Sequence, residues 1–166
     1  MITIDEFMTS DPYTLRESNS LDDAWKVMTE KHIRHIPITD DDKHLLGLVT
    51  QRDVLAATDP ASKQQAKNIA HESDAEIKLS DIMIRGVSAI HKTDSLRQAA
   101  QYLQSHKYGC LPVISDDRLV GIITDSDFID IAINLLEQVE MTEETDETGE
   151  EGALDDAALP EFDEIL

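Results

Sequence analysis

The chain has 166 residues, 40% of them hydrophobic and 30% charged, which is typical of a globular protein with one compact core or two small ones. Its formal net charge at pH 7 is −21, and residues 137–166 hold 13 acidic residues with no Lys or Arg. Such a chain repels polyanions, which disfavours nucleic-acid binding. A single cysteine, Cys110, excludes an internal disulfide. With no apolar run of about 18 residues and no signal peptide, the sequence predicts a soluble, cytoplasmic protein with no membrane partner.

The sequence repeats itself at a spacing of about 75 residues. A shift of 75 aligns Met8 with Met83, Ser20 with Ser95, Leu21 with Leu96, Ala24 with Ala99 and Pro37 with Pro112. After a turn that is one residue shorter in the second copy, a shift of 74 aligns Asp42 with Asp116, Leu45 with Leu119, Gly47 with Gly121, Thr50 with Thr124 and Asp53 with Asp127. Such a period indicates a duplicated structural unit. We expect a first repeat over 1–57, a partly helical linker over 58–78, a second repeat over 79–139 and an acidic, disordered tail over 140–166.

Both repeats predict the same order of elements. A short extended piece, over 13–15 and over 87–90, precedes a helix with an apolar stripe. Each helix begins with the spacing of a capping box, in which side chains satisfy free N–H groups of the first turn; the pairs are Ser20 with Asp23 and Ser95 with Gln98.

A hairpin and a second helix complete each repeat. The predicted strands are 35–39 and 45–49 in the first copy, and 110–114 and 119–123 in the second. Because proline cannot donate to a strand ladder, Pro37 and Pro112 predict strands that are edges or are locally broken. The sequence therefore indicates an α/β (α+β) protein built from two βαββα repeats.

The most informative segments are Gly-Leu-Val-Thr-Gln-Arg-Asp over 47–53 and Gly-Ile-Ile-Thr-Asp-Ser-Asp over 121–127. Each places a Thr at the end of a strand and an Asp three residues later, at the start of a helix. Free N–H groups at a helix N-terminus suit phosphate, and a carboxylate there can accept from both hydroxyls of a ribose. The same spacing is also a capping box that needs no ligand. Its recurrence at the same place in both repeats favours a nucleotide site.

These residues resemble a tandem pair of CBS domains, the unit named after cystathionine β-synthase; such a pair is often called a Bateman module. The resemblance covers residues 4–138 and includes the strands around the two prolines, over 33–38 and 108–113, and the segment 11–14. It implies repeats packed through their sheets with pseudo-twofold symmetry and clefts between them. It also implies a stand-alone, non-catalytic regulatory module that forms a homodimer. The implied ligand is an adenosyl nucleotide (AMP, ADP, ATP or S-adenosylmethionine), with no cofactor required.

The resemblance also implies roles for individual residues. Asp53 and Asp127 would hold ribose, Thr50 and Thr124 would lie beside ribose or phosphate, and Thr14 and Ser88 would lie near the base. Before the strand proline the first repeat has Arg34 and His35, whereas the second has Gly109 and Cys110, so we expect unequal sites. In so acidic a chain, ATP needs local positive charge from Arg34, His35 and Arg52, or a bridging Mg²⁺. The expected nucleotide-binding set is Thr14, Arg34, His35, Thr50, Arg52, Asp53, Ser88, Thr124, Ser126 and Asp127.

Three functions stay open at this point. The leading one is a sensor that binds an adenosyl nucleotide and signals to a separate regulated protein. The second is a constitutive interaction module, in which Thr-x-x-Asp only caps helices and the acidic tail recruits a partner. The third is a small nucleotide hydrolase, for which the sequence offers no catalytic motif. The six histidines form no zinc motif, Cys110 predicts a small buried residue, and residues 40–42 predict a solvated hairpin turn.

Overall fold

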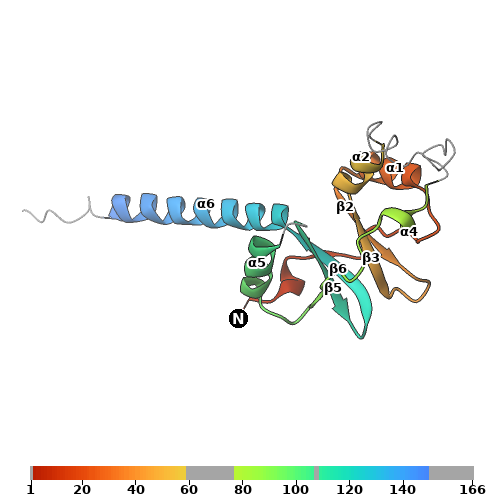
Figure 1. The fold of residues 1–166 in the computed structure, drawn as a ribbon. Coiled ribbons are helices and arrows are strands. Elements are labelled where there is room, and N and C mark those ends of the chain that lie inside the picture. Colours follow the sequence, from red (N-terminus) through yellow and green to blue (C-terminus); the bar gives the residue numbers. More distant parts are fainter. Residues whose placement is uncertain (1, 59–76, 107–108, 150–166) are drawn as a thin grey trace, which may run out of the picture. The chain divides into compact units, whose positions relative to one another are not determined.

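The computed structural model describes residues 2–58, 77–106 and 109–149 (Figure 1). It divides into one compact unit, Met1–Phe128, and a second unit, Ile129–Leu166, that begins within the last helix. The first unit contains both hairpins. Most of the predicted linker, 59–76, lies outside the described residues, as does the end of the acidic tail, 150–166.

The first repeat contains the predicted helix, hairpin and helix. Helix α1 (Leu21–Lys31) begins at Ser20, whose hydroxyl accepts the Asp23 N–H at 3.1 Å while the Asp23 carboxylate accepts the Ser20 N–H at 2.9 Å. The bond from the Ser20 backbone N–H is the main cause that lowers the pKa of Asp23. Strands β2 (His35–Thr39) and β3 (Leu45–Thr50) pair antiparallel, and helix α2 (Gln51–Thr58) follows without a break. The predicted capping box and hairpin are confirmed.

The second repeat has the same elements one period later. Helix α5 (Leu96–Ser105) has the predicted capping box of Ser95 with Gln98. Its strands are β4 (Ile90–His91), β5 (Cys110–Ser115) and β6 (Arg118–Thr124), followed by helix α6 (Asp125–Gly149). Both hairpins shift register at equivalent places, between Ile38 and Thr39 and between Val113 and Ile114. The βαββα order is therefore present in the second repeat with every strand formed.

The first strand of each repeat is shorter than predicted. In the segment 13–15, only Leu15 forms a ladder bridge, to Ile38, and the predicted strand 87–90 is displaced to β4. Strand β4 pairs with β5 only at Val113 and Ile114, so Pro112 lies just beyond the paired stretch. Proline is thus tolerated where a strand has no neighbour on one side, as the sequence predicted.

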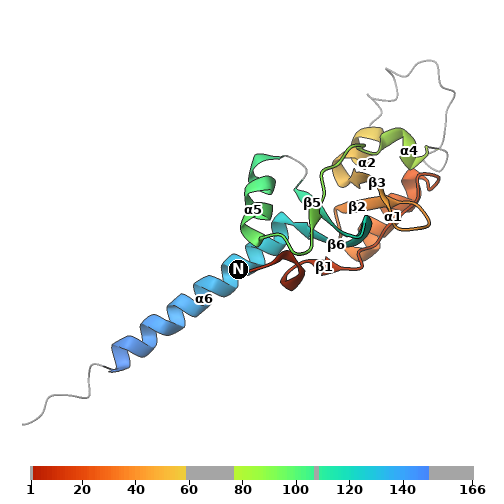
Figure 2. The ribbon, with the colours of Figure 1, turned by 90° about the horizontal axis from the view of Figure 1, so that it is seen from below.

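Each repeat is completed by the segment at the start of the other repeat; we call residues 2–10 and 77–84 the lead segments. The first lead segment holds a 3-10 turn, η1 (Ile4–Glu6), and strand β1 (Thr9–Ser10). Strand β1 pairs with β6 of the second repeat, and Figure 2 shows the two strands side by side. The four-stranded sheet therefore has the order β1-β6-β5-β4, with residues from both ends of the first unit.

The second lead segment, with helix α4 (Leu79–Ile82), makes the reciprocal contact. Ile84 forms an antiparallel bridge with Leu48 in β3. Equivalent hydrogen bonds occur one period apart with the repeats exchanged, as expected of pseudo-twofold symmetry. Leu21 N–H donates to the Ile77 carbonyl at 2.9 Å, and Leu96 N–H donates to the Ile2 carbonyl at 3.1 Å. The two repeats are therefore interlocked.

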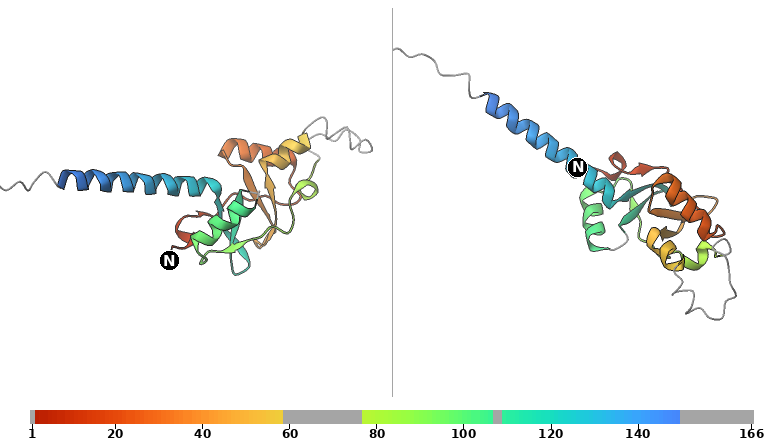
Figure 3. Two further views of the ribbon diagram at one scale, coloured as in Figure 1. Left: turned by 60° about the vertical axis from the view of Figure 1, so that its left-hand side comes forward. Right: turned by 90° about the horizontal axis from the view of Figure 1, so that it is seen from above.

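The hydrophobic core follows the same exchange. The first repeat buries one face of α1 and α2 against its hairpin, an arrangement visible in Figure 3. Leu79 and Met83, from the second lead segment, are buried in that same cluster. A second cluster joins Leu48 of β3 to Cys110 and Ile122 of the other hairpin. The repeats therefore pack through their sheets, as predicted.

Helix α6 is longer than predicted. It continues to Gly149, so residues 140–149 are helical where the sequence predicted a disordered tail. That prediction considered only the lack of a packed core, whereas a helix that has already started adds one backbone hydrogen bond per residue without such a core. Within the described part of the chain, no helix combines the length and the apolarity needed to cross a membrane.

Candidate functional site

The open end of each hairpin brings the predicted site residues together. His35 pairs with Thr50 across the first hairpin, and Cys110 pairs with Thr124 across the second. The residue before each hairpin also meets the helix that follows it. Gln51 N–H donates to the Arg34 carbonyl at 2.8 Å, and the equivalent bond from Asp125 N–H to the Gly109 carbonyl is 3.2 Å long.

In both Thr-x-x-Asp segments the Asp side chain bonds back to the Thr, and in the first repeat a reciprocal bond completes a capping box. Asp53 Oδ2 accepts from the Thr50 N–H at 2.8 Å and from its hydroxyl at 2.7 Å, and the Asp53 N–H contacts the Thr50 hydroxyl oxygen at 3.3 Å. Asp127 Oδ2 accepts from the Thr124 N–H at 2.6 Å and from its hydroxyl at 3.0 Å. The capping interpretation left open by the sequence is therefore part of the structure.

Capping leaves chemical capacity at each aspartate. The bonds above all use Oδ2, so the second carboxylate oxygen, Oδ1, is outside them. An ionised carboxylate has about four acceptor positions, enough for a cap and for further hydroxyl donors. Thr50 is 9% exposed and Asp53 is half-buried, so the box holds that carboxylate in one place at the surface. A cap and a ribose contact are thus compatible in one side chain.

The two repeats also meet at this end of the hairpins. A Cβ placed on Gly109 would lie 3.2 Å from Asp125 Oδ2 and 3.5 Å from His35 Nε2. His35 of the first repeat therefore lies beside the loop and helix start of the second. Gly109 itself has φ +67°, a conformation that favours glycine.

The remaining predicted residues are exposed. Arg34, Arg52 and Ser126 are all exposed. Arg52 lies in the first turn of α2, and Ser126 lies in the first turn of α6. Thr14 precedes Leu15, whose N–H donates to the Pro37 carbonyl at 3.2 Å. Thr14 and Ser88 are not equivalent, because Leu15 bridges Ile38 and Ile90 pairs with Val113, which aligns Thr14 with Ala89.

Cys110 occupies the position that His35 holds in the first repeat. Burial raises the pKa of its thiol to about 12, and the nearby carboxylates of Asp125 and Asp127 add to the increase. The neutral thiol packs against Leu48 and Ile122, which agrees with the predicted small buried residue. The second repeat thus replaces a polar side chain with an apolar one at this position.

Sequence reasoning missed Asp125. It lies directly after Thr124, at the first residue of α6, where the first repeat has Gln51. A comparison of the two heptads position by position shows the exchange of Gln for Asp. The prediction included the differing pair Arg52 and Ser126 but not Gln51 and Asp125, so this difference in charge went unnoticed.

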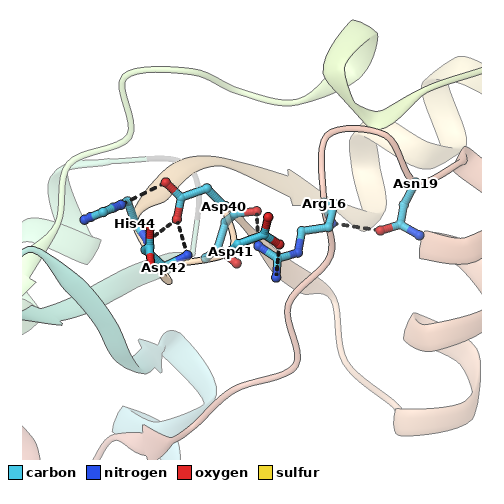
Figure 4. A network of polar contacts seen from close by, with 7 residues as sticks. Arg16, Asn19, Asp40, Asp41, Asp42 and His44 are labelled. Carbon is cyan, nitrogen blue, oxygen red and sulfur yellow. Dashed lines mark hydrogen bonds and ion pairs between the residues drawn. The ribbon is translucent and has the colours of Figure 1, made fainter.

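The acidic hairpin turn is a separate network (Figure 4). Asp40 Oδ1 accepts from the N–H groups of Asp42 and His44 at 2.9 Å each, and Asp40 Oδ2 lies 2.8 Å from His44 Nδ1. Arg16 forms an ion pair with Asp41 at 3.0 Å. The carboxylates stabilise the turn and approach Arg16, as expected of a solvated hairpin. Among the described residues, no group of three or more His, Cys, Asp or Glu could hold a metal ion.

Comparison with known families agrees with this architecture. The CBS domain profile matches residues 4–59 and again residues 79–134. A profile match to both repeats, with the interlocked hairpins described above, defines a tandem CBS pair. The chain belongs to the CBS domain family.

Several solved structures share the fold. The Vibrio cholerae protein AcuB is 45% identical, with a TM-score of 0.70 over 85% of this chain and 97% of that one. CBSX2, a CBS-pair protein from Arabidopsis thaliana, is 28% identical in a complex with AMP, with a TM-score of 0.69 over 81% of this chain and 98% of that one. The CBS domain pair of protein MJ0100, in complex with 5'-methylthioadenosine and S-adenosylmethionine, is 25% identical, with a TM-score of 0.63 over 78% and 98%.

A curated relative is much longer than the match. The homoserine O-acetyltransferase of Methanohalobium evestigatum is 34% identical over 125 residues, which are 75% of this chain and 23% of that protein. The chain therefore spans about a quarter of the length of this relative, and the enzyme's name describes a protein with much more sequence than the match.

Proposed function

We propose that this protein is a non-catalytic, cytoplasmic regulatory module that binds an adenosyl ligand (AMP, ADP, ATP or S-adenosylmethionine) and passes its occupancy to a separate protein. The observation that carries the proposal is the doubled Thr-x-x-Asp box at the open ends of two interlocked hairpins. Support comes from relatives of the same fold, of which CBSX2 is in complex with AMP and the MJ0100 pair with two adenosyl compounds.

The chemistry of the region suits such a ligand. Asp53 and Asp127 each have one carboxylate oxygen outside the cap, and this oxygen can accept ribose hydroxyls. Arg34 and Arg52 are exposed next to the first box and supply positive charge for phosphate, directly or with Mg²⁺ as a bridge. Thr14 and Ser88, both exposed, offer hydroxyls for polar atoms of the base. In this proposal the clefts between the repeats contain one site for each box.

We also propose that two copies pair through their helices. Trp25 of α1 and Leu55 of α2 are 42% and 51% exposed and line the same shallow hollow. Large apolar side chains that face solvent on neighbouring helices favour contact with another apolar surface. A homodimer buries them against the same residues of a second copy. Ligand binding can then change the homodimer only if the ligand binds one of two arrangements of the two copies more tightly than the other.

A second candidate function is favoured by a specific observation. Both Thr-x-x-Asp segments have hydrogen bonds of their own, because Asp53 and Asp127 each accept from the N–H and the hydroxyl of the Thr three residues earlier. In this alternative the module is a constitutive interaction platform, and its acidic C-terminal segment recruits a partner. It predicts that no adenosyl ligand stabilises the protein and that removal of residues 140–166 abolishes capture of that partner.

Thermal unfolding against a ligand panel separates the two. We would titrate AMP, ADP, ATP, GTP and S-adenosylmethionine, with and without Mg²⁺. A ligand at about 100 times its Kd adds about 2.7 kcal/mol of stability, a shift of several degrees for a unit of this size. The sensor proposal expects such a shift with adenosyl compounds and none with GTP. An unchanged midpoint with every compound would leave the interaction platform as the better account.

The mutations must spare the cap, because loss of a cap alone costs about 1 kcal/mol. Asp53→Asn and Asp127→Asn keep one oxygen that can accept the Thr N–H, but they replace the second acceptor with a donor. The combined variant is expected to fold and to lose the ligand-induced shift. Thr50→Ser, which keeps the hydroxyl, is the matched control and should retain it. If the Asn variant binds as tightly as the unmodified protein, the assigned ribose contact is wrong.

A further inference from the structure

The two Thr-x-x-Asp segments differ in the charge that the residues of their own repeat place beside them. Next to the first box lie Arg34, His35 and Arg52, with a neutral Gln51 directly after the Thr. The equivalent positions of the second repeat hold Gly109, Cys110, Ser126 and the carboxylate of Asp125. The first box thus has basic neighbours from its own repeat. The second box has none from its own repeat and has the additional carboxylate of Asp125.

The structure fixes where that added acid lies. Asp125 Oδ1 accepts from the Ser126 N–H at 2.9 Å, and Asp125 Oδ2 lies 3.2 Å from where a Gly109 Cβ would be. The carboxylate is therefore held against the loop before β5, on the same side as the open end of the hairpin. His35 Nε2, from the other repeat, flanks the same glycine at 3.5 Å.

This placement removes what makes a helix start attractive to phosphate. The positive end of a helix amounts to about half a charge, carried by the free N–H groups of its first turn. Asp125 adds a full negative charge there and already uses the Ser126 N–H. A phosphate brought to the start of α6 must displace this bond and approach two carboxylates, those of Asp125 and Asp127. At the start of α2, Gln51 adds no charge, so the attraction remains.

We infer that the two boxes take different classes of adenosyl ligand, an inference that rests on the function proposed above. The box of the first repeat binds adenosyl ligands that carry phosphate. Asp125 makes the box of the second repeat select adenosyl ligands without phosphate, whose ribose and base bind there without an anionic group. Gln51 and Asp125 are the residues that determine this specificity.

Reciprocal exchanges test the inference. Asp53→Asn leaves the second box to be measured, and Asp127→Asn leaves the first. In the Asp53→Asn background we would add Asp125→Gln, and in the Asp127→Asn background we would add Gln51→Asp. Isothermal titration calorimetry with AMP and with adenosine gives the ratio of the two affinities for each protein. One added or removed charge within a few ångströms should change that ratio by about tenfold.

The expected directions are opposite in the two repeats. Asp125→Gln should raise the preference for AMP over adenosine about tenfold, and Gln51→Asp should lower it by a similar factor. Asp130→Gln is the control, because it removes one negative charge from α6 beyond its first turn; the ratio should then stay within about twofold. A matching change in the control would mean that net charge, and not the place of Asp125, sets the ratio, which overturns the inference.

The remaining outcomes separate this inference from the function on which it rests. If adenosine and AMP both bind but neither exchange changes their ratio, the specificity assignment is wrong and the proposed adenosyl site stands. If neither compound binds to the unmodified protein, the inference fails, and the proposed function fails too if no compound of the thermal-unfolding panel stabilises the protein. The two exchanges lie in different repeats, so misfolding of one variant still leaves an independent measurement.

Discussion

The two repeats of this molecule share the same backbone elements and differ in the residues around their Thr-x-x-Asp boxes. Both have a capped helix, a hairpin with a register shift at the same place and a Thr-x-x-Asp box at its open end. The first repeat carries basic and polar groups beside its box, where the second has Gly109, a buried thiol and Asp125. Residues that build the backbone frame are thus duplicated, whereas the residues around the two boxes have diverged.

The repeats also differ in how tightly each receives the lead segment of the other. Gly47 in β3 faces a backbone group, since an added Cβ would lie 2.7 Å from the Ile84 carbonyl oxygen. The three heavy atoms nearest to a Cβ added at Gly121 in β6 all belong to the side chain of Met8. A backbone carbonyl fixed in a ladder cannot move aside as a flexible thioether can. The contact of the second lead segment with the first repeat should therefore tolerate less change.

The largest effect is expected from the core residue that crosses between repeats. Leu79 belongs to the second lead segment but is fully buried in the core of the first repeat. Leu79→Ala should lower the free energy of unfolding by about 3 kcal/mol, because a buried leucine leaves a cavity. Trp25, the single tryptophan, lies in α1 of the first repeat and reports on it by fluorescence. In the variant, the urea midpoint of the unfolding transition seen by Trp25 fluorescence should fall together with the midpoint seen by far-ultraviolet circular dichroism.

Leu136→Ala makes the same truncation at an exposed position and should cost much less, about 0.5 kcal/mol. A Trp25 transition that stays in place after Leu79→Ala would show that the first repeat folds without the second lead segment. The interlocked core would then have no energetic role.

The two glycine contacts provide a smaller, paired test. Gly47→Ala should cost about 2 kcal/mol, because the Ile84 oxygen also accepts the Leu48 N–H at 3.0 Å and cannot shift freely. Gly121→Ala should cost less than about 1 kcal/mol, since Met8 can change rotamer. Urea unfolding of both variants measures the difference. Adding Met8→Ala to Gly121→Ala should restore part of the loss, and equal costs at the two glycines would contradict the proposed asymmetry.

Much of the fold follows from the sequence because its local signals agree. The hairpins and the helix starts at Ser20 and Ser95 were predictable from alternation, turns and capping spacing. The packing of each lead segment against the other repeat could not be predicted from the sequence. The repeat shows that Met8 and Met83 are equivalent, but periodicity cannot say which copy of a symmetric pair a segment packs against. That choice depends on tertiary contacts such as the Gly121–Met8 approach.

The candidate site could be predicted from the sequence to a similar extent. The paired Thr and Asp could be recognised because they recur, and the unequal basic residues Arg34 and His35 could be recognised because they do not. Asp125 was missed because its effect depends on where the carboxylate lies, and only the structure places it beside Gly109 and His35. Charge at a site depends on three-dimensional neighbours, and those come from both repeats.

The smallest predicted effect concerns the capping boxes at the starts of α1 and α5, which differ in charge. In α1 the returning side chain is Asp23, an ionised acceptor, whereas in α5 it is the neutral Gln98, whose Oε1 accepts the Ser95 N–H at 3.3 Å. Gln98→Glu should stabilise α5 by about 0.5 kcal/mol, because a carboxylate near a helix N-terminus interacts favourably with the dipole and makes a stronger bond. Urea unfolding at pH 7 measures it.

The pH dependence of this gain has a definite sign. A carboxylate that is stabilised in the folded state has a lowered pKa there, so its contribution is present above the unfolded pKa of about 4.3 and is lost as the pH falls through the folded value. Asp23 already shows the lowered pKa that the exchange would give to residue 98. The gain from Gln98→Glu should therefore disappear in acid, whereas Gln98→Ala should cost about the same at pH 7 and at pH 4. A gain that persists at low pH would mean that helix propensity, rather than the charged cap, distinguishes the two repeats.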